Sequence, residues 1–167
     1  MDFNKLIEKA SQSKWGMWKL NFLLQRFIPF NKPHGLKVIL LSKNEVKVLL
    51  PYKKNNLNHI KGLHACGLAT AAEYASGLLL LYKLGSKEYR IIMESINVEY
   101  KYQGKMNGIA SFDISDEDFQ NEVYKPIEKE ELVYKKCLIK VHDEKGNLLC
   151  NATTNWQIKK WDKVKTK

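Results

Sequence analysis

The stretch from Leu57 to Gly85, which reads LNHIKGLHACGLATAAEYASGLLLLYKLG, decides the fold. Within it, residues 63–82 form an apolar run whose clearly polar side chains are His64, Thr70 and Glu73. Only an α-helix can carry a regular run of this length, because strands seldom exceed about ten residues. Gly85 then follows as a typical helix stop. The sequence therefore predicts a long helix from Leu63 to Tyr82 that is buried on nearly all sides.

A membrane span is the competing interpretation of the same run, because about 20 apolar residues suffice to cross a bilayer. Glu73 lies near the middle of the run, where a carboxylate is costly in lipid. The flanking segments have strand patterns rather than the patterns of further spans. We therefore expect a soluble protein without stable membrane insertion, in which strands wrap the helix.

Short apolar or alternating segments on both sides of the helix predict these strands. Their turns, such as the Gly-Asn turn at residues 144–147, are short enough to pair neighbouring strands antiparallel. The predicted strands cover residues 35–42, 45–51, 96–102, 106–114, 132–142 and 148–161. The fold class is therefore α+β, with a curved antiparallel sheet of about six strands around one long central helix. We expect the acidic residues 116–131, which include Pro126, to form a solvated excursion.

An amphipathic helix is predicted for residues 4–28, with Gly16 as a candidate break and Pro29 beginning a linker. Trp15 and Trp18 with interleaved Lys leave two interpretations open. One is an interfacial helix that touches a membrane. The other, which we favour, is a helix whose two Trp side chains pack over the sheet or the mouth of the core. The whole chain, residues 1–167, reads as one domain, with 1–33 as the N-terminal helix and linker and 162–167 as a frayed tail.

Composition limits the function classes. The formal net charge is +10, from 28 basic and 18 acidic residues. Such a surface attracts an anionic partner, for example a nucleotide-bearing thioester, a lipid surface or nucleic acid, and charge alone does not choose among them. The three Cys residues have no CxxC spacing and the His residues are scattered, so neither a disulfide framework nor a metal site is predicted. The polar N-terminus has no apolar signal region, and we expect a cytoplasmic location.

The candidate chemistry lies at the start of the long helix and within it. The amides of about Ala65 and Cys66 are candidates for holding a carbonyl oxygen that becomes negative during acyl transfer. Glu73 is a candidate general base or nucleophile. It lies eight residues past Ala65, which is roughly 12 Å along a helix, so it can reach such a carbonyl only from a second copy of the chain. The arrangement therefore predicts a homodimer, with stacking into a tetramer as a further option.

Other roles are open for the same residues. Glu73 is equally compatible with a carboxylate tied to a Lys or to a backbone N–H. His64 and Asn58 are more often residues that order a loop or a turn than catalytic groups. Cys66 is expected to be a small packing residue rather than a reactive thiol. Gly62, Cys66 and Thr70 complete the set as candidate substrate contacts.

Residues 58–73 read N-H-x-x-G-x-H-A-C-G-L-A-T-A-A-E, with Asn58 six residues before His64 and Glu73 nine after it. This stretch resembles the active-site stretch of hotdog-fold acyl-CoA thioesterases of the phenylacetate-pathway type, and still more closely an uncharacterised bacterial hotdog family. The resemblance implies that Asn58 contacts the thioester or water. It also implies that the Ala65 amide forms the oxyanion hole and that Glu73 acts from the other subunit.

Two departures from the family pattern affect the expected site. The family's His-Gly-Gly is here His64-Ala65-Cys66, which places two side chains next to the thioester, and the usual Asp is Glu73. The expected function is hydrolysis of an acyl-CoA or related thioester at a dimer-interface site, with His64 among the catalytic candidates. The alternative is a non-catalytic acyl-thioester or lipid-binding protein. A dehydratase is less expected, and no cofactor, metal or nucleic-acid partner is predicted.

Overall fold

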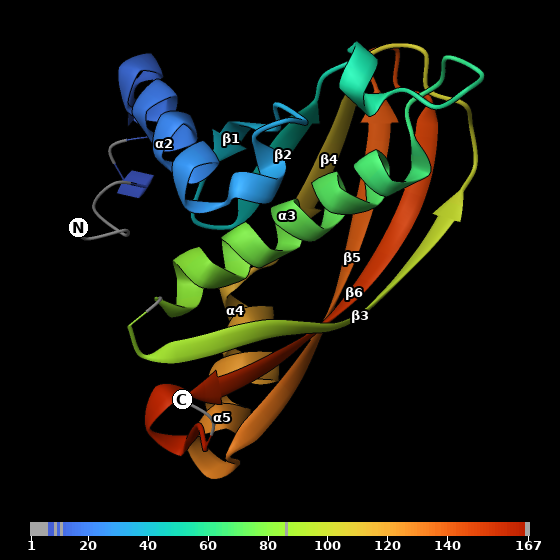
Figure 1. Cartoon of the computed structure of the whole chain (residues 1–167). Helices are drawn as coiled ribbons and strands as arrows, with labels where there is room; N and C mark the ends of the chain where they lie inside the picture. Colours follow the sequence, from blue (N-terminus) through green and yellow to red (C-terminus); the bar gives the residue numbers. More distant parts are fainter. Residues whose placement is uncertain (1–6, 9, 11, 86, 166–167) are drawn as a thin grey trace.

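The computed structural model describes residues 7–165 other than 9, 11 and 86. Its centre is a six-stranded antiparallel sheet in the order β1-β2-β4-β5-β6-β3, curved around the long helix α3 (Figure 1). The strands are β1 (Lys37–Leu41), β2 (Glu45–Leu50), β3 (Tyr89–Tyr100), β4 (Gly108–Asp113), β5 (Leu132–Asp143) and β6 (Leu148–Lys160). The helices are α2 (Lys14–Phe27), α3 (Ala65–Leu84), α4 (Asp116–Phe119) and α5 (Lys125–Lys129). Short turns are η1 (Pro29–Asn31), η2 (Lys54–Asn56), the π-helical η3 (Gln120–Tyr124) and η4 (Trp161–Lys163). The predicted α+β class and strand number are confirmed.

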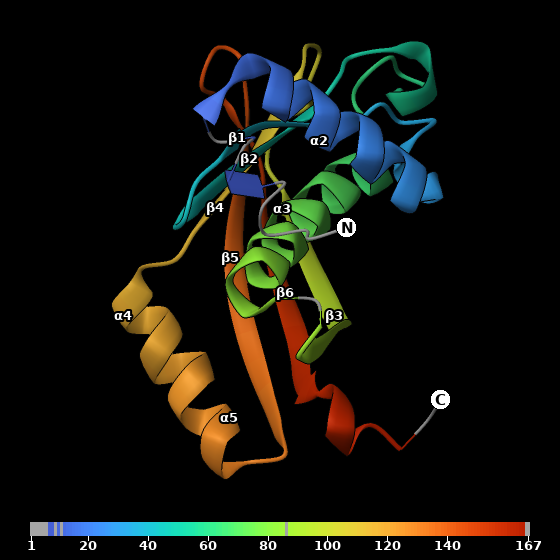
Figure 2. The ribbon, with the colours of Figure 1, turned by 90° about the vertical axis from the view of Figure 1, so that its left-hand side faces the viewer.

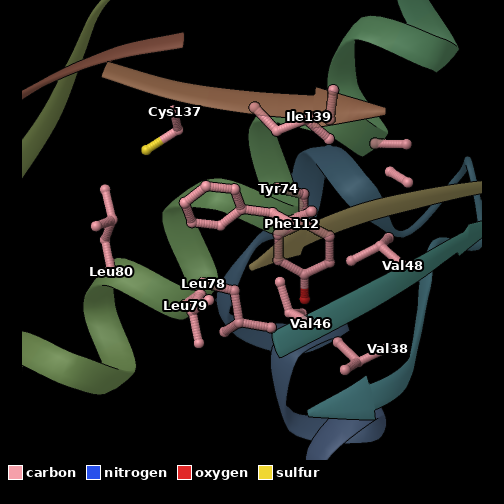
Figure 3. Close-up of a cluster of buried hydrophobic side chains, with 14 of the residues drawn as sticks. Val38, Val46, Val48, Tyr74, Leu78, Leu79, Leu80, Phe112, Cys137 and Ile139 are labelled. Atoms are coloured by element: carbon pink, nitrogen blue, oxygen red, sulfur yellow. The ribbon is translucent and has the colours of Figure 1, made fainter. Parts of the chain in front are cut away.

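The long helix is confirmed, shifted two residues towards the C-terminus at each end. His64 caps its first turn, and Gly85 ends it with a φ of 77°, which favours glycine. α3 is long and apolar enough to cross a membrane, with a mean hydropathy of 1.2. Within the structure, 56% of the helix window with this hydropathy is buried. Figure 3 shows Val46 and Val48 of β2, Phe112 of β4 and Ile139 of β5 turned towards the helix.

A buried polar contact fixes α3 against β6. The indole Nε1 of Trp156 donates to Ser76 Oγ and to Thr154 Oγ1, at 3.0 Å each. The two hydroxyls lie 3.1 Å apart. Gly77 leaves room for the ring, because a Cβ there would lie 2.7 Å from a Trp156 carbon. The helix and the sheet therefore meet through directional bonds as well as through apolar packing.

β3 is an edge strand and begins earlier than predicted. Its first residues, Tyr89 to Met93, pair with Lys160 to Trp156 of β6 although their sequence does not alternate cleanly. Ile96 and Val98 are only partly buried, and Tyr100 is 48% exposed. The inward face of β3 is therefore incompletely covered by its own chain.

Residues 116–131 are mostly exposed, as expected of a solvated excursion, and residues 116–129 are helical. α4, η3 and α5 follow one another beside β5 (Figure 2), and Ser115 Oγ caps the first turn by accepting from the Asp118 amide. Phe119, Val123 and Ile127 recur at four-residue spacing and are buried. This buried stripe was not predicted, because acidic residues surround it in the sequence and it occupies only one face of the segment.

α2 packs on the edge strand β1. Asn21 Oδ1 accepts from the Val38 amide at 2.7 Å, and Asn21 Nδ2 donates to the Val38 carbonyl at 2.9 Å. The helix begins after Ser13, whose Oγ accepts from the Gly16 amide, so the predicted break falls at Ser13 and not at Gly16. The expected helix start at Asn4 lies outside the described residues, as do residues 166–167 of the expected frayed tail.

The prediction that Trp15 and Trp18 pack over the sheet is wrong. Both are on the outer face of α2, with 69% and 62% of their surfaces exposed. The face of α2 that is buried carries Gly16, Leu20 and Leu24 instead.

Candidate functional site

The loop before α3 is a closed turn held by Asn58. Its side-chain Oδ1 accepts from the backbone amides of Ile60 (3.1 Å) and Gly62 (2.9 Å). Its backbone amide donates to the Gly62 carbonyl at 2.8 Å. Lys61 adopts a φ of 59° within the turn. Gly62 is buried behind it, where a Cβ would lie 2.7 Å from Gln103. Asn58 therefore orders the turn. Among its side-chain atoms, only Nδ2 has no partner among the described residues, so Nδ2 is the atom available to contact a substrate.

His64 is the N-cap of α3. Its Nδ1 accepts from the Cys66 amide at 3.1 Å, and its backbone amide donates to the Asn56 carbonyl at 2.8 Å. The Cys66 amide is therefore already bonded, which corrects the expectation that it holds an oxyanion. Among the described residues, the amides of Ala65 and Gly67 have no acceptor. The helix N-terminus thus offers two donors, of which the Ala65 amide was predicted from the sequence and the Gly67 amide was not.

A cavity of about 260 Å³ opens beside this helix start. It is lined by Phe30, His34, Asn55, Asn56, Leu57, His64, Cys66, Gly67 and Thr70. Of the predicted site residues, it brings together His64, Cys66 and Thr70. Asn58, Gly62, Ala65 and Glu73 are outside this lining. Cys66 is exposed at the cavity rather than packed in the core, which corrects the expectation of a packing residue.

Asn56 was not identified from the sequence, yet it joins three segments at the cavity. It makes five hydrogen bonds although it is only 1% exposed. Nδ2 donates to the carbonyls of His34 and Pro51 at 2.8 Å each, and Oδ1 faces His34 Nδ1 at 3.0 Å. Its backbone amide donates to the Lys53 carbonyl, and its backbone carbonyl accepts from His64. The only sequence signal is an Asn two residues before Asn58, which does not distinguish a buried amide from a turn residue.

The hydrogen-bond partners assign different tautomers to the two His residues of the cavity. Asn56 Nδ2 faces two carbonyls, so Oδ1 is the acceptor and His34 Nδ1 must carry the proton. His34 Nε2 is then left with a lone pair. His64 has the opposite arrangement, because its Nδ1 accepts and Nε2 carries the proton. The cavity therefore contains one imidazole nitrogen that can accept a hydrogen bond and another that can donate one.

Glu73 lies farther along α3, about two turns beyond the helix start. It follows Cys66 by seven positions and Thr70 by three, spacings that place the three on one side of the helix. The Glu73 side chain is partly buried, and its carboxylate has no hydrogen bond or ion pair to any described residue. Burial raises the pKa of this carboxyl above its usual value. Within the described chain, Glu73 is thus not tied to a Lys or to a backbone N–H.

The described part of the chain has no set of side chains suited to binding a metal ion. Within residues 7–165 other than 9, 11 and 86, His, Cys, Asp and Glu do not gather in groups of three or more that could hold an ion. The chemistry available at this site is therefore that of backbone amides, imidazoles and one partly buried carboxylate.

The curved sheet wrapped on one long helix is the hotdog fold, as the resemblance to hotdog-fold thioesterases implied. The chain belongs to the family described as domain of unknown function DUF4442, whose model matches residues 16–158. Among solved structures it is similar to PA5026 of Pseudomonas aeruginosa, a protein of unknown function and probable thioesterase. The TM-score is 0.77 at 21% identity, over 85% of this chain and 95% of that one.

Two further structures share the fold. A putative thioesterase from Shewanella oneidensis has a TM-score of 0.68 at 13% identity, covering 84% of this chain and 95% of that one. The thioesterase HI1161 from Haemophilus influenzae has a TM-score of 0.67 at 12% identity, covering 86% and 90%. No curated protein matches the chain.

Proposed function

We propose that this protein hydrolyses an acyl thioester, of acyl-CoA or a related carrier, at a site shared by two subunits. The observation that carries the proposal is the partly buried Glu73 carboxylate, which has no partner among the described residues and has a raised pKa. A carboxylate of this kind is poised to take a proton from water. The structural neighbours called thioesterases support the same class of reaction.

The shared site is supported by the uncovered edge of the sheet. Residues that face each other on antiparallel strands share a side, so Ile96 and Val98 of β3 lie beside Thr154 and Ala152 of β6. The two β6 side chains are fully buried, whereas the two β3 side chains are only partly buried. A second copy paired along β3 would continue the sheet and cover this face with its own α3. Two antiparallel α3 helices would then bring each Glu73 towards the partner's helix N-terminus.

The proposed reaction uses groups from both subunits. The amides of Ala65 and Gly67 donate to the thioester carbonyl oxygen and stabilise the negative charge that develops on it. Glu73 of the other subunit takes a proton from the attacking water, whose oxygen bonds to the carbonyl carbon. The carbon–sulfur bond then breaks, and the proton from Glu73 goes to the leaving thiolate. The products are a carboxylic acid and a free thiol.

A thiol-release screen over short-chain, long-chain and aromatic acyl-CoAs tests the proposal. If the wild type releases thiol, Glu73→Gln should lower turnover about 100-fold or more, because the amide keeps the size but cannot act as a base. Asn58→Ala should also weaken turnover. The matched control is Glu117→Gln on the exposed α4, which should leave turnover unchanged. Equal rates for Glu73→Gln and wild type would remove Glu73 from the mechanism.

A non-catalytic acyl-thioester-binding or lipid-binding protein is the second candidate. It is favoured by one observation: the Cys66 amide, an expected oxyanion donor, is bonded to His64. Saturable binding of an acyl-CoA without thiol release from any thioester in the screen would select this candidate. Release that depends on Glu73 would reject it.

A further inference from the structure

The outer face of α2 carries a row of exposed aromatic side chains that do not pack into the core. Trp15, Trp18 and Phe22 are 69%, 62% and 57% exposed. The rings of Trp18 and Phe22 stack with centroids 5.8 Å apart. At 3.6 residues per turn, the three positions fall within roughly 60° of arc. This aromatic ridge, defined as Trp15, Trp18 and Phe22, lies opposite the buried Leu20 and Leu24.

The ridge is flanked by cations and has no acidic neighbour in the sequence. Residues 14–44 contain six basic residues and no Asp or Glu. Three of the basic residues, Lys14, Lys19 and Arg26, are exposed on α2, on either side of the ridge, and none forms an ion pair with a described residue. Lys19 Nζ lies 5.6 Å from the centroid of the Trp15 ring. The face is therefore both aromatic and strongly basic.

Beyond the ridge, a surface hollow brings Arg26 together with one further cation, Lys32. It has a volume of about 220 Å³ and is lined by Phe22, Gln25, Arg26, Pro29 and Lys32. Arg26 and Lys32 both border it, next to the ring of Phe22. A hollow with two cations at its rim suits an anionic group such as a phosphate.

A second copy of the chain is a poor occupant for this face. A two-fold contact through the ridge would set Lys14, Lys19 and Arg26 against the same residues of the other copy, which is unfavourable. α2 also packs on β1, which is the opposite edge of the sheet from β3 (Figure 2). A dimer formed along β3 would therefore leave the ridge uncovered. The positive charge of this face favours an anionic binding partner.

We propose that α2 binds the surface of an anionic lipid bilayer, with the helix lying in the plane of the membrane. Trp and Phe side chains are favoured at the boundary between lipid headgroups and acyl chains, and flanking cations bind anionic headgroups. The hollow beside Arg26 and Lys32 receives a headgroup phosphate. The contact is peripheral, because the remaining face of α2 stays packed on β1. It does not depend on the proposed hydrolysis.

Vesicle flotation tests the proposal with the full chain. The protein should float with vesicles of phosphatidylglycerol and phosphatidylcholine and stay unbound with phosphatidylcholine alone. Trp15→Ser combined with Trp18→Ser should weaken the binding by at least about tenfold, because the buried aromatic area is lost. Trp161→Ser, which changes an exposed Trp at the end of β6, is the matched control and should bind as the wild type does. Absence of binding to the anionic vesicles, or equal binding by the double variant, would overturn the proposal.

A charge variant separates the lipid surface from other occupants. Lys19→Ala combined with Arg26→Ala should weaken vesicle binding roughly tenfold or more at about 0.1 M salt, and the difference should shrink towards 1 M salt. Sedimentation of the double Trp variant should match that of the wild type. A smaller assembly would assign the ridge to a second copy instead. If the wild type binds single-stranded DNA but not vesicles, and the double Trp variant loses the DNA binding, the ridge is assigned to nucleic acid instead.

Discussion

His34 Nδ1 lies 3.0 Å from Asn56 Oδ1, and this contact joins the segment before β1 to the segment that leads into α3. The two residues are 22 positions apart in the sequence. Because Asn56 also binds the Pro51 and His34 carbonyls, one buried amide holds one wall of the candidate cavity together.

Asn56→Ala should lower the free energy of unfolding by about 2–3 kcal/mol, since it leaves buried carbonyls and an imidazole N–H without partners. Urea unfolding followed by circular dichroism measures the change. Asn55→Ala is the neighbouring control: Asn55 is exposed and makes one long hydrogen bond of 3.3 Å, so its loss should cost less than about 0.5 kcal/mol. Similar losses for both variants would contradict the role given to Asn56.

His64 should contribute to stability mainly as a helix cap. His64→Ala removes the acceptor for the Cys66 amide and should cost about 1 kcal/mol in unfolding free energy. His64→Ser supplies another capping oxygen and should restore most of that loss. If thiol release is found, a Ser variant that recovers stability but not turnover would assign the imidazole a chemical role as well.

The pH dependence of stability should report on Glu73. Its pKa is raised in the folded protein, so the folded state holds the proton more tightly than the unfolded chain does. Burial of the ionised form therefore costs stability above the raised pKa, and that cost disappears below the usual value of 4.5. Glu73→Gln should unfold at higher urea concentration than wild type at pH 7, and the gap should close as the pH falls towards 4.5. A gap that stays constant across this window would show that Glu73 is not desolvated.

The dimer along β3 should be sensitive to charge on the inner face of that strand. Ile96→Lys places an ammonium where the second copy is proposed to pack, and should weaken dimerisation at least about tenfold, which is about 1.4 kcal/mol. Ile39→Lys on β1, the other edge strand, is the matched control and should leave the assembly unchanged. Sedimentation equilibrium at micromolar concentration measures both. A monomeric wild type would contradict the shared site.

Periodicity and turns were enough to predict the central helix and six strands, because those signals are local. Long-range contacts explain most of what was missed. The first half of β3 forms because β6 is long enough to pair with it, and its own sequence does not alternate. The apolar stripe of Phe119, Val123 and Ile127 was concealed by the acids around it. In α2 the Trp residues were assigned to the buried face, because the sequence does not say which of two apolar faces meets the sheet.

The candidate site was predicted only in part for the same reason. Cys66 and Thr70 are four residues apart on one helix, and His64 caps the first turn of the same helix, so their proximity is local in the sequence. His34 and Asn56 enter the cavity through the fold, from before β1 and after β2. The bonding of the Cys66 amide depends on the rotamer of His64, which the sequence does not specify.

The bonds among Trp156, Ser76 and Thr154 bear on how well defined the candidate site can be. A helix that is apolar nearly all round can slide or turn against a sheet at little cost in buried area, and a slip of one residue turns it by about 100°. Hydrogen bonds tolerate no such slip, so this polar triangle selects a single orientation of α3. Without it we expect the protein to keep its core but to define the rotation of α3, and therefore the position of the Glu73 carboxylate, less sharply.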